Sequence, residues 1–452
     1  MPDLYTWFVS RVLFPLHERF KGHDSVERLR VLESSQWLPP YAIEQHRVRR
    51  LRDFLVNIGS GVPYYARLFA EAGFDPASVR TLEDLQRLPL LTKPVIRANT
   101  EALKARTAGR LKRYNTGGSS GEPLIFYIGP GRVSHDVAAK WRATRWWGVD
   151  IGDPEIVVWG SPVELGAQDW TRAARDRVLR TRLLSAFEMS APNLDRFLEA
   201  IRSMRPRSLF GYPSALAHIA RHAETRGRRM DDLGIEVAFV TAEQLYPDQR
   251  TRIARTFGCK VANGYGGRDA GFIAHECPEG GMHISAEDIV VEIVDPGSGA
   301  PVPAGDAGEV VVTHLATADF PFVRYRTGDI GVLDDRPCAC RRGLPLLKEI
   351  QGRSTDFVVA YDGTVVHALA LIYALREQPA VEAFKIVQES RESIRVALVP
   401  REGFTETVAE SIRKAFRARL GERVDVRIEQ VQEIRPERSG KYRYVVNHLD
   451  AH

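Results

Sequence analysis

A short run of glycines and hydroxyl residues after residue 114 has the composition of an anion-binding loop. From Asn115 to Gly121 the chain reads NTGGSSG, and apolar, β-favouring residues follow soon after. Glycines permit a tight turn with positive φ, and successive backbone amides in such a turn can surround an anion. The hydroxyls of Thr116, Ser119 and Ser120 would add donors to phosphate oxygens. Taken alone, the run is more typical of a linker or a plain hairpin turn, and it lacks the spacing of a Walker loop.

Four side chains in a second region have the ligand types of a zinc site. Cys277 and His283 flank the turn CPEGGMH, and Cys338 and Cys340 form a Cys-x-Cys pair beyond a strand-rich segment. Three thiolates and one imidazole would complete a tetrahedral zinc site with no position left for water, which indicates a structural role. His275 is a competing ligand, but His283 is favoured because it enters the strand after the turn. Ordinary thiols with an unrelated histidine are the alternative interpretation.

The composition restricts the class of protein. A chain of 452 residues is too long for one core, so two or three domains are expected. The net charge is +5, but only ten of the 63 basic residues are lysine and no dense basic block occurs, so nucleic-acid binding is not expected. Four cysteines in this length do not form a disulfide scaffold, which favours a reducing compartment, the cytoplasm.

The N-terminal segment is apolar without the features of a membrane span or a leader. No apolar run reaches the length that a spanning helix needs. Residues 4–16, LYTWFVSRVLFPL, are interrupted by Arg11 and lack the basic start and cleavage site of a signal peptide. An amphipathic helix is predicted, packed on the body of the protein or on a second copy in a homodimer. A peripheral membrane contact is the alternative.

The elements that must position these residues fall into three groups. Residues 40–105 have the apolar spacing of helices. From 155 to 265 strands and helices alternate, which predicts a largely parallel sheet covered by helices, with ligands at the carboxyl ends of its strands. Residues 283–350 contain strands separated by Pro/Gly turns and predict a β-rich subdomain. The last hundred or so residues predict a small α/β module with its own core.

Five segments resemble, in order, the signature segments of the adenylate-forming superfamily, which includes acyl-CoA ligases and adenylation domains. They are YNTGGSSGEP (114–123), NGYGGRDAG (263–271), YRTGDIG (325–331), IQGRSTDFV (350–358) and RPERSGKYR (435–443). The forms GGSSGEP, FGYPSAL, VTAEQL and CAC resemble the phenylacetate–CoA ligase branch, which is similar in carrying cysteines here. The N-terminal 110 residues and GRSTDFVVAYDGTVVH resemble the subset of that branch encoded with capsule and secondary-metabolite genes.

The resemblance implies a reaction in two halves. ATP would convert a carboxylate, an aryl or small organic acid, into an acyl-adenylate with release of pyrophosphate, and the acyl group would then pass to CoA. Transfer to an amine or hydroxyl acceptor without CoA is the alternative, and a non-catalytic nucleotide-binding homologue is a third. The resemblance also implies an N-terminal domain over residues 1–352 and a mobile C-terminal domain over 353–452, with Asp356 as the hinge.

The resemblance also implies roles for single residues. Asp329 would accept the ribose hydroxyls, Arg353 would reach the ribose or a phosphate, and Lys441 would reach the α-phosphate and the carboxylate oxygen. Tyr265 would stack on adenine. The loop that would hold the β- and γ-phosphates consists of Thr116, Gly117, Gly118, Ser119, Ser120 and Gly121. Glu243 and Asn263 are expected near the adenine, and Gly264 and Gly266 are expected to bind the nucleotide. The walls expected for the acid are Trp159, Gly160, Tyr212 and Pro213.

One position departs from the family pattern. The family usually has a glutamate after Tyr-Gly-x-Thr that is thought to hold Mg²⁺, whereas this chain reads Arg268-Asp269. Asp269 keeps the carboxylate but is one methylene shorter. Mg²⁺ binding is therefore expected through Asp269 either directly or through a water, which Mg²⁺ tolerates.

Overall fold

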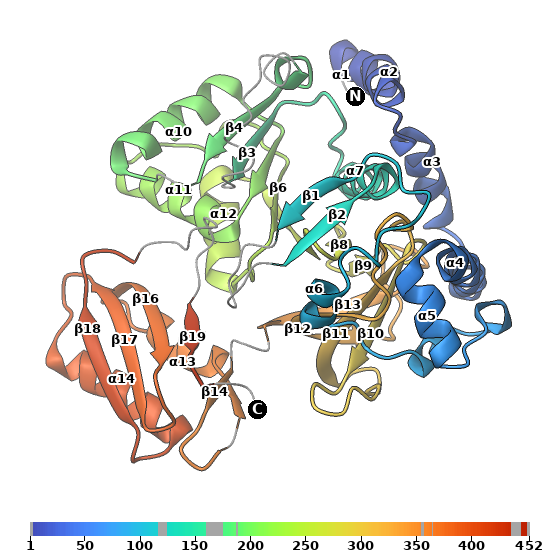
Figure 1. Cartoon of the computed structure of the whole chain (residues 1–452). Helices are drawn as coiled ribbons and strands as arrows, with labels where there is room; N and C mark the ends of the chain where they lie inside the picture. Colours follow the sequence, from blue (N-terminus) through green and yellow to red (C-terminus); the bar gives the residue numbers. More distant parts are fainter. Residues whose placement is uncertain are drawn as a thin grey trace. The chain divides into compact units, whose positions relative to one another are not determined.

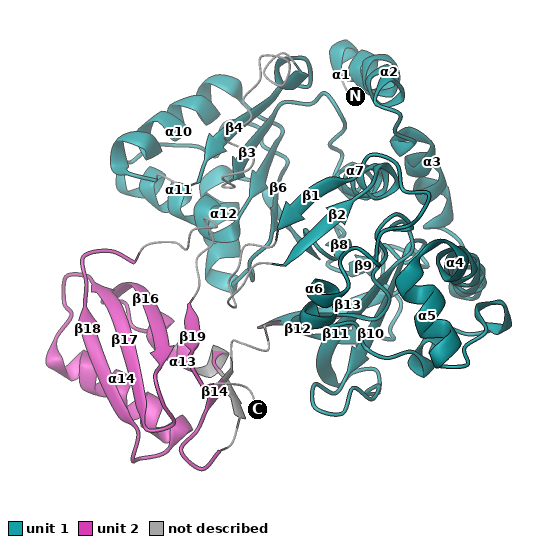
Figure 2. Cartoon of the chain, viewed as in Figure 1, with its two compact units in different colours: residues 1–351 teal, residues 352–452 magenta. Residues whose placement is uncertain are grey.

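The chain divides into two compact units, residues 1–351 and 352–452, coloured separately in Figure 2. The computed structural model describes residues 3–115, 124–159, 175–186, 189–353, 357–363, 365–434 and 444–449. The division lies one residue before the boundary expected from the sequence. Among the described helices, none combines the length and apolar composition needed to cross a bilayer.

Within the described residues, the larger unit is built on one sheet of 11 strands, in the order β10-β11-β12-β13-β9-β8-β7-β6-β5-β3-β4 (Figure 1). The strands are β3 (Glu155–Trp159), β4 (Thr181–Ser185), β5 (Ser208–Gly211), β6 (Val237–Thr241), β7 (Lys260–Gly267), β8 (Gly271–Glu276), β9 (Met282–Ile284), β10 (Ile289–Val294), β11 (Ala307–His314), β12 (Tyr325–Asp334) and β13 (Leu346–Arg353).

The two halves of this sheet differ in strand direction. The pairs β3–β4, β3–β5, β5–β6 and β6–β7 are parallel, as predicted. The edge strand β4 itself was not expected from the sequence. The pairs β7–β8, β8–β9, β9–β13, β10–β11 and β11–β12 are antiparallel. The segment 283–350, expected as a β-rich subdomain, therefore supplies strands β10 to β13 of the same sheet, because β8 pairs with β7 on one side and β9 on the other, and β9 pairs with β13.

Helices cover both faces of the parallel half. The side chains of β6 alternate: Ala238 and Val240 pack with the helices α10 (Ala191–Met204), α11 (Pro213–Thr225) and α12 (Pro247–Phe257). Val237 and Phe239 pack on the opposite face with Val149, which follows helix α7 (Pro130–Arg145). Parallel strands are normally buried on both faces, and this strand is apolar at four consecutive positions for that reason.

Helices also surround the antiparallel half. They are α3 (Ser25–Ser35), α4 (Pro40–Gly61), α5 (Pro63–Glu71), α6 (Lys93–Ala98) and two short 3-10 helices, Pro76–Ser78 and Glu83–Arg87. Buried residues of α4, α5 and α6, such as Leu55, Phe69 and Ile96, join one core with strands β8 to β12. The helical prediction for residues 40–105 is confirmed in this way.

The N-terminal segment is helical, as predicted, and packs on the larger unit. Helices α1 (Leu4–Phe8) and α2 (Phe14–Phe20) are joined by the π-helical turn Val9–Leu13. Val9 and Phe14 pack with Ile151, and the hydroxyl of Tyr5 donates to the carbonyl of Val178 at 2.9 Å. The outward side remains apolar, since Phe20 is 93% exposed. Other exposed apolar side chains of residues 4–41 include Leu4, Trp7, Phe8, Leu16, Trp37 and Tyr41.

A separate antiparallel hairpin is formed by the strands that precede and follow the glycine-rich segment in the sequence. Its strands are β1 (Lys112–Asn115) and β2 (Ile125–Ile128), with Asn115 opposite Ile125. The sequence predicted β2 from its apolar run but not β1, whose residues KRYN are mostly polar and exposed. The loop residues 116–123 lie outside the described residues.

The smaller unit contains a hairpin and a four-stranded sheet. The hairpin pairs β14 (Phe357–Val359) with β15 (Val365–His367). The sheet has the order β18-β17-β16-β19. Its strands are β16 (Val381–Gln388), β17 (Ser393–Pro400), β18 (Asp425–Gln430) and β19 (Val445–Asn447), with helices α13 (Leu369–Arg376) and α14 (Glu406–Leu420). The predicted strand pair, helix and strand of this module are confirmed.

Candidate functional site

Predicted site residues from several strands lie in one row at the carboxyl ends of the parallel half. Val158 of β3 pairs with Gly211 of β5, and Gly211 pairs with Val240 of β6. Val240 in turn pairs with Asn263 of β7. The next residues along these strands are Trp159, Tyr212, Thr241 and Gly264. The carboxyl edge of a parallel sheet is the usual ligand site of such folds, so this row is the candidate site.

Asp329 and Tyr265 come from different signature segments and meet in the structure. The hydroxyl of Tyr265 donates to Oδ2 of Asp329 at 2.9 Å. Burial, together with the neighbouring Asp329 charge, raises the pKa of Tyr265, so the phenol remains a donor. The backbone amide of Asp329 donates to Oγ1 of Thr327 at 3.1 Å. A carboxylate accepts several hydrogen bonds, so Asp329 keeps capacity for ligand hydroxyls.

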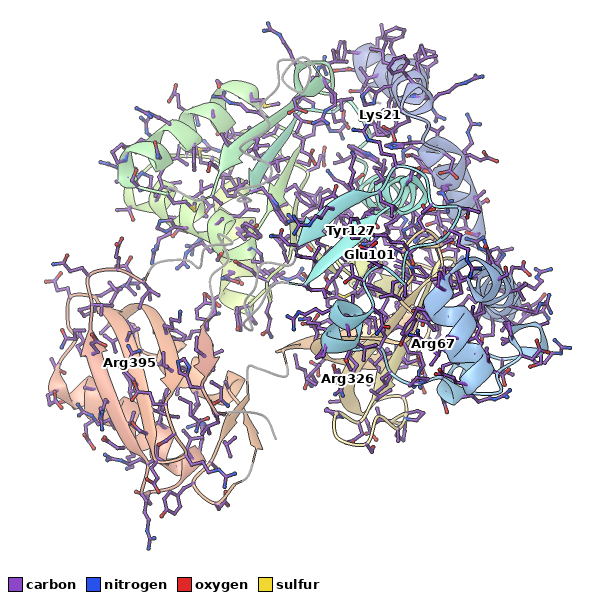
Figure 3. All side chains as sticks on the ribbon, viewed as in Figure 1. Lys21, Arg67, Glu101, Tyr127, Arg326 and Arg395 are labelled. Atoms are coloured by element: carbon purple, nitrogen blue, oxygen red, sulfur yellow. The ribbon has the colours of Figure 1, made fainter. Side chains whose placement is uncertain are left out.

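The strand around Asp329 is held by a buried carboxylate on the neighbouring strand. Glu309 of β11 accepts a hydrogen bond from the backbone amide of Gly328 at 3.1 Å. Gly328 has a φ of +78°, a conformation that glycine adopts without strain. Glu309 also forms an ion pair with Arg326, which Figure 3 labels on β12. Asp329 is thus set by backbone geometry as well as by its side-chain partners.

Asp269 lies in the turn between β7 and β8 and is anchored from two directions. The hydroxyl of Tyr325 donates to Oδ2 of Asp269 at 2.6 Å. Arg132 of α7 donates to the backbone carbonyl of Arg268 at 3.2 Å and to that of Asp269 at 3.5 Å. Gly266 permits the close approach of the two strands here, since a Cβ at this position would lie 2.2 Å from a β8 carbonyl oxygen. The carboxylate therefore has a defined position.

Glu243 follows a strained residue at the end of β6. Ala242 has a φ of +70°, which is costly for a residue with a side chain and is found preferentially at functional sites. A carboxylate oxygen of Glu243 accepts a hydrogen bond from the backbone amide of Ser214 at 3.2 Å, in the first turn of α11. Asn263 is tied through its backbone amide to Glu276 at 2.7 Å. Glu243 thus follows the carboxyl end of β6, and Asn263 lies on the adjacent strand β7 opposite Val240.

An aromatic wall stands at the β3 and β5 end of the row. The rings of Trp159 and Tyr212 are stacked with centroids 4.3 Å apart and planes at 20°. Phe210 lies beside Trp159 with centroids 5.8 Å apart. Pro213 begins α11 directly after Tyr212. Of the predicted substrate-wall residues, Trp159 and Tyr212 therefore stack on each other, and Pro213 follows Tyr212 directly in the chain.

All four predicted zinc ligands come together in the larger unit. One ligand atom from each of Cys277, His283, Cys338 and Cys340 lies within 4.8 Å of the others. The sulfurs of Cys277 and Cys338 are 3.6 Å apart, and Nε2 of His283 is 3.1 Å from the sulfur of Cys340. Zinc–sulfur bonds of ~2.3 Å in a tetrahedron place two sulfurs ~3.8 Å apart, so this donor set fits zinc. Gly281 leaves room for it, since a Cβ there would lie 2.6 Å from the Cys338 sulfur.

His283, rather than His275, supplies the imidazole of this cluster. Nδ1 of His283 donates to the carbonyl of Leu344 at 3.3 Å, which leaves the Nε2 lone pair for a metal. Burial lowers the pKa of His283 to about 4, so the ring is neutral, as a metal ligand must be. His275 faces it across the β8–β9 pair but stacks on Phe272 and joins no such group among the described residues.

Comparison with known proteins gives the family. A model described as AMP-binding enzyme matches residues 183–318, and one described as CapK C-terminal domain matches residues 358–448. Protein CapK of Staphylococcus aureus is 24% identical over 408 residues, which are 89% of this chain and 88% of that protein. A phenylacetate-coenzyme A ligase of Thermus thermophilus is 27% identical over 328 residues, 70% of this chain and 71% of that enzyme. The chain belongs to the adenylate-forming superfamily.

Within this superfamily, the CapK and phenylacetate-coenzyme A ligase relatives identify the phenylacetate–CoA ligase branch and its capsule-type subset. The fold agrees. A 2-hydroxyisobutyryl-CoA ligase, solved in its postadenylation state, superposes with a TM-score of 0.75 at 23% identity, covering 91% of this chain and 90% of that one. The adenylate-forming fold that the sequence motifs implied is therefore confirmed.

Several predicted site residues of this superfamily member lie outside the described residues. These are the loop residues Thr116, Gly117, Gly118, Ser119, Ser120 and Gly121, together with Gly160, the hinge candidate Asp356 and Lys441. Arg353 is described only by its backbone, as the last residue of β13. The roles expected for these residues remain predictions.

Sequence reasoning missed two groups of contacting residues. Tyr325, Thr327 and Asp329 occupy every second position of β12. The two-residue period of a strand, applied to YRTGD, would have placed all three on one face. Arg132 lies more than a hundred residues before the turn that it contacts, and no local pattern links the two. It is visible only in the tertiary structure.

Protonation of a buried histidine near the site predicts a pH-dependent stability. Burial, aided by the charge of Arg132, lowers the pKa of His314 to about 3. Below pH ~6.5 the unfolded chain therefore binds a proton that the folded protein excludes, so the free energy of unfolding falls by up to ~1.4 kcal/mol per pH unit from this residue. His314→Asn keeps an acceptor for the Ala316 amide and should flatten the slope of stability in urea titrations between pH 6 and 4. Equal slopes for both proteins would contradict this.

Proposed function

We propose that this protein is an ATP-dependent carboxylate–CoA ligase, which forms an acyl-adenylate and pyrophosphate and then an acyl-CoA and AMP. The observation that carries the proposal is that residues from separate signature segments are joined by hydrogen bonds, Tyr265 to Asp329 and Tyr325 to Asp269. Relatives from Thermus thermophilus and Pseudomonas putida are named phenylacetate-coenzyme A ligase, which favours CoA over an amine or hydroxyl acceptor.

The acid is proposed to be an aryl or small organic acid. The stacked rings of Trp159 and Tyr212 support an apolar or aromatic acyl group beside them. Tyr212 is 2% exposed, so it is packed behind the partly exposed Trp159. Gly160 would continue the wall beyond Trp159.

Positioning and charge stabilisation are the main tasks of the residues in this reaction. Attack of the carboxylate on the α-phosphate concentrates negative charge there, so cations and donors aimed at that charge should dominate catalysis. Asp329 would hold the ribose hydroxyls and Tyr265 would lie against the adenine. Lys441 would neutralise the α-phosphate and Arg353 would reach the ribose or a phosphate. The loop from Thr116 to Gly121 would retain the departing pyrophosphate.

Mg²⁺ would be held by Asp269. Its carboxylate fits a cation that prefers oxygen ligands, and the Tyr325 hydroxyl fixes its orientation. When bound, Mg²⁺ would neutralise part of the phosphate charge. Residues 353–452 are proposed to rotate about Asp356 between the two half-reactions, bringing Lys441 in for the first and removing it for the second.

Replacing Asp329 with asparagine should weaken ATP use. A hydrogen bond to a charged group contributes ~1.5–3 kcal/mol, so kcat/KM for ATP should fall about 10- to 100-fold. Initial rates over a range of ATP concentrations measure this change. Asp334→Asn is the matched control. Asp334 ends the same strand, and its ion pair among the described residues is with the exposed Arg336. A KM for ATP that is unchanged in a folded Asp329→Asn protein would exclude the ribose role.

Pyrophosphate exchange over a panel of acids tests the reaction as a whole. Acid-dependent incorporation of labelled pyrophosphate into ATP is the expected result, and product mass in the presence of CoA or of candidate amines identifies the acceptor. Absence of exchange with every acid of a broad panel would favour a non-catalytic nucleotide-binding homologue. Amide or ester products without acyl-CoA would favour the alternative ligase.

We further propose that Cys277, His283, Cys338 and Cys340 hold a structural Zn²⁺. The donor set leaves no open position, so the ion would join the β8–β9 turn to the segment after β12 without taking part in the reaction. A reducing compartment, the cytoplasm, would keep these thiols available as ligands.

The outward side of α1 and α2 is proposed to make a peripheral contact with membranes. Leu4 and Phe20 are 88% and 93% exposed, and Arg11, Arg19 and Lys21 lie among the apolar residues. Such a composition suits an interfacial helix on anionic lipid. Flotation with phosphatidylserine vesicles should carry the protein upward, and Phe20→Ser should weaken this. Concentration-dependent dimers that Phe20→Ser dissociates, without flotation, would instead assign the surface to a homodimer.

A further inference from the structure

A buried arginine connects helix α7 to the turn that carries Asp269. The side chain of Arg132 is 4% exposed, and its Nε donates to the two carboxylate oxygens of Asp136 at 3.0 and 2.9 Å. The other nitrogens of the guanidinium donate to the backbone carbonyls of Arg268 and Asp269. Arginine suits this task because its planar fork makes several hydrogen bonds in a fixed geometry.

The turn packs directly on this arginine. Gly271, which begins β8, has a φ of +95°. A Cβ at this position would lie 2.8 Å from the ring of His314 and 3.2 Å from the guanidinium of Arg132. The backbone from 268 to 271 therefore has no room to shift toward α7. Tyr325 holds the side chain of Asp269, and Arg132 holds its main chain.

The surrounding ionisable groups favour bracing over a second metal site. His135, Asp136 and His314 offer ligand atoms within 4.8 Å of one another. Asp136, however, already accepts from Arg132 through both oxygens. The other acidic residues nearby are also paired: Asp288 with Arg50, and Glu287 with Arg142. A divalent cation would add uncompensated charge to a buried, balanced network, which is unfavourable.

We infer that Arg132 is a positioning residue for the adenylation half-reaction, fixing the backbone at 268–269 so that the Asp269 carboxylate is correctly placed for Mg²⁺. This inference rests on the proposed function. Residues behind a metal ligand typically change metal affinity 10- to 100-fold when replaced, although they never touch the ion. Asp136 supports the same role by orienting the guanidinium.

Two measurements on the full-length protein test the inference. The first is the metal requirement, which is the Mg²⁺ concentration that gives half-maximal pyrophosphate exchange. Binding of Mn²⁺ in the presence of ATP, measured by electron paramagnetic resonance, gives the metal affinity without turnover. The second is hydrogen–deuterium exchange of the peptide containing residues 268–271. Arg132→Met should raise the metal requirement about tenfold and speed exchange in that peptide. Arg132→Lys keeps the charge but loses the planar fork of the guanidinium. Its metal requirement and its exchange rate at 268–271 should lie between those of the wild type and those of Arg132→Met.

Arg145→Met is the matched control. Arg145 also belongs to α7 and is ion-paired, but with Glu33 and Asp150. It should change neither the metal requirement nor exchange at 268–271. If Arg132→Met does not fold, Asp136→Asn removes the orienting charge with little change of shape and should act in the same direction.

A folded Arg132→Met protein with a wild-type metal requirement, or with unchanged exchange at 268–271, would overturn the inference. Loss of stability with an unchanged metal dependence would assign Arg132 a structural role only. Failure of the wild-type protein to exchange pyrophosphate with any acid would contradict the proposed function instead. The Mn²⁺ and hydrogen-exchange measurements would still test the position of Asp269 in that case.

Discussion

Replacing Lys441 with alanine is expected to lower the rate of acyl-adenylate formation about 100- to 1,000-fold, the typical cost of removing one donor aimed at developing negative charge. The charge develops on the α-phosphate only in the first half-reaction. Transfer of the acyl group from preformed acyl-adenylate to CoA should therefore proceed at close to the wild-type rate. Pyrophosphate exchange measures the first step, and thioester formation from synthetic adenylate measures the second.

The control for this experiment is a lysine outside the proposed active site. Lys414 lies exposed on α14 of the same unit, so Lys414→Ala removes an equal charge without touching the proposed chemistry. Both half-reactions should be unaffected by it. Equal loss of both half-reactions in a folded Lys441→Ala protein would exclude a role confined to adenylation, and with it the proposed exchange of Lys441 between the two steps.

Loss of the zinc site should have the largest effect on stability. Cys338→Ser removes one of three thiolates, and the purified protein should then contain less than ~0.5 equivalent of zinc, against about one for the wild type. An ion present at 1,000 times its dissociation constant stabilises the native state by ~4 kcal/mol, so unfolding should become easier by at least a comparable amount. Metal analysis and urea unfolding with and without a chelator measure both quantities.

Two further variants separate the ion from ordinary packing. Cys259→Ser replaces a half-buried thiol outside the cluster, so this variant should contain as much zinc as the wild type. Gly281→Ala keeps all four ligands, but its Cβ would lie 2.6 Å from the Cys338 sulfur and should displace it, so zinc should be lost. A wild-type protein with no zinc and with stability insensitive to chelator would contradict a structural metal site.

Much of the fold and of the candidate site could be predicted from local sequence. The alternation of strands and helices from 155 to 265 predicted the parallel half of the sheet. The run VAFVT of β6 is apolar at consecutive positions because both faces of a parallel strand are covered. Tyr265, Asp269 and Asp329 were identified by the signature segments around them. The ligand types and turns of the cysteine–histidine group were local features in the same way.

Only the tertiary structure determined how these segments meet. That residues 283–350 continue the large sheet follows from the pairing of β9 with both β8 and β13, and pairing between distant segments leaves no local pattern. The sequence favoured His283 over His275 only by its place after the turn, whereas the structure adds contacts that separate them: the Leu344 carbonyl behind His283 and the Cys340 sulfur before it. The role inferred for Arg132 has the same origin, because its hydrogen bonds span 136 and 137 residues of sequence. The sequence alone determined which chemistry the residues can perform, since that depends on their types and immediate neighbours. The fold decided which of them touch, since that depends on register and packing across the whole sheet.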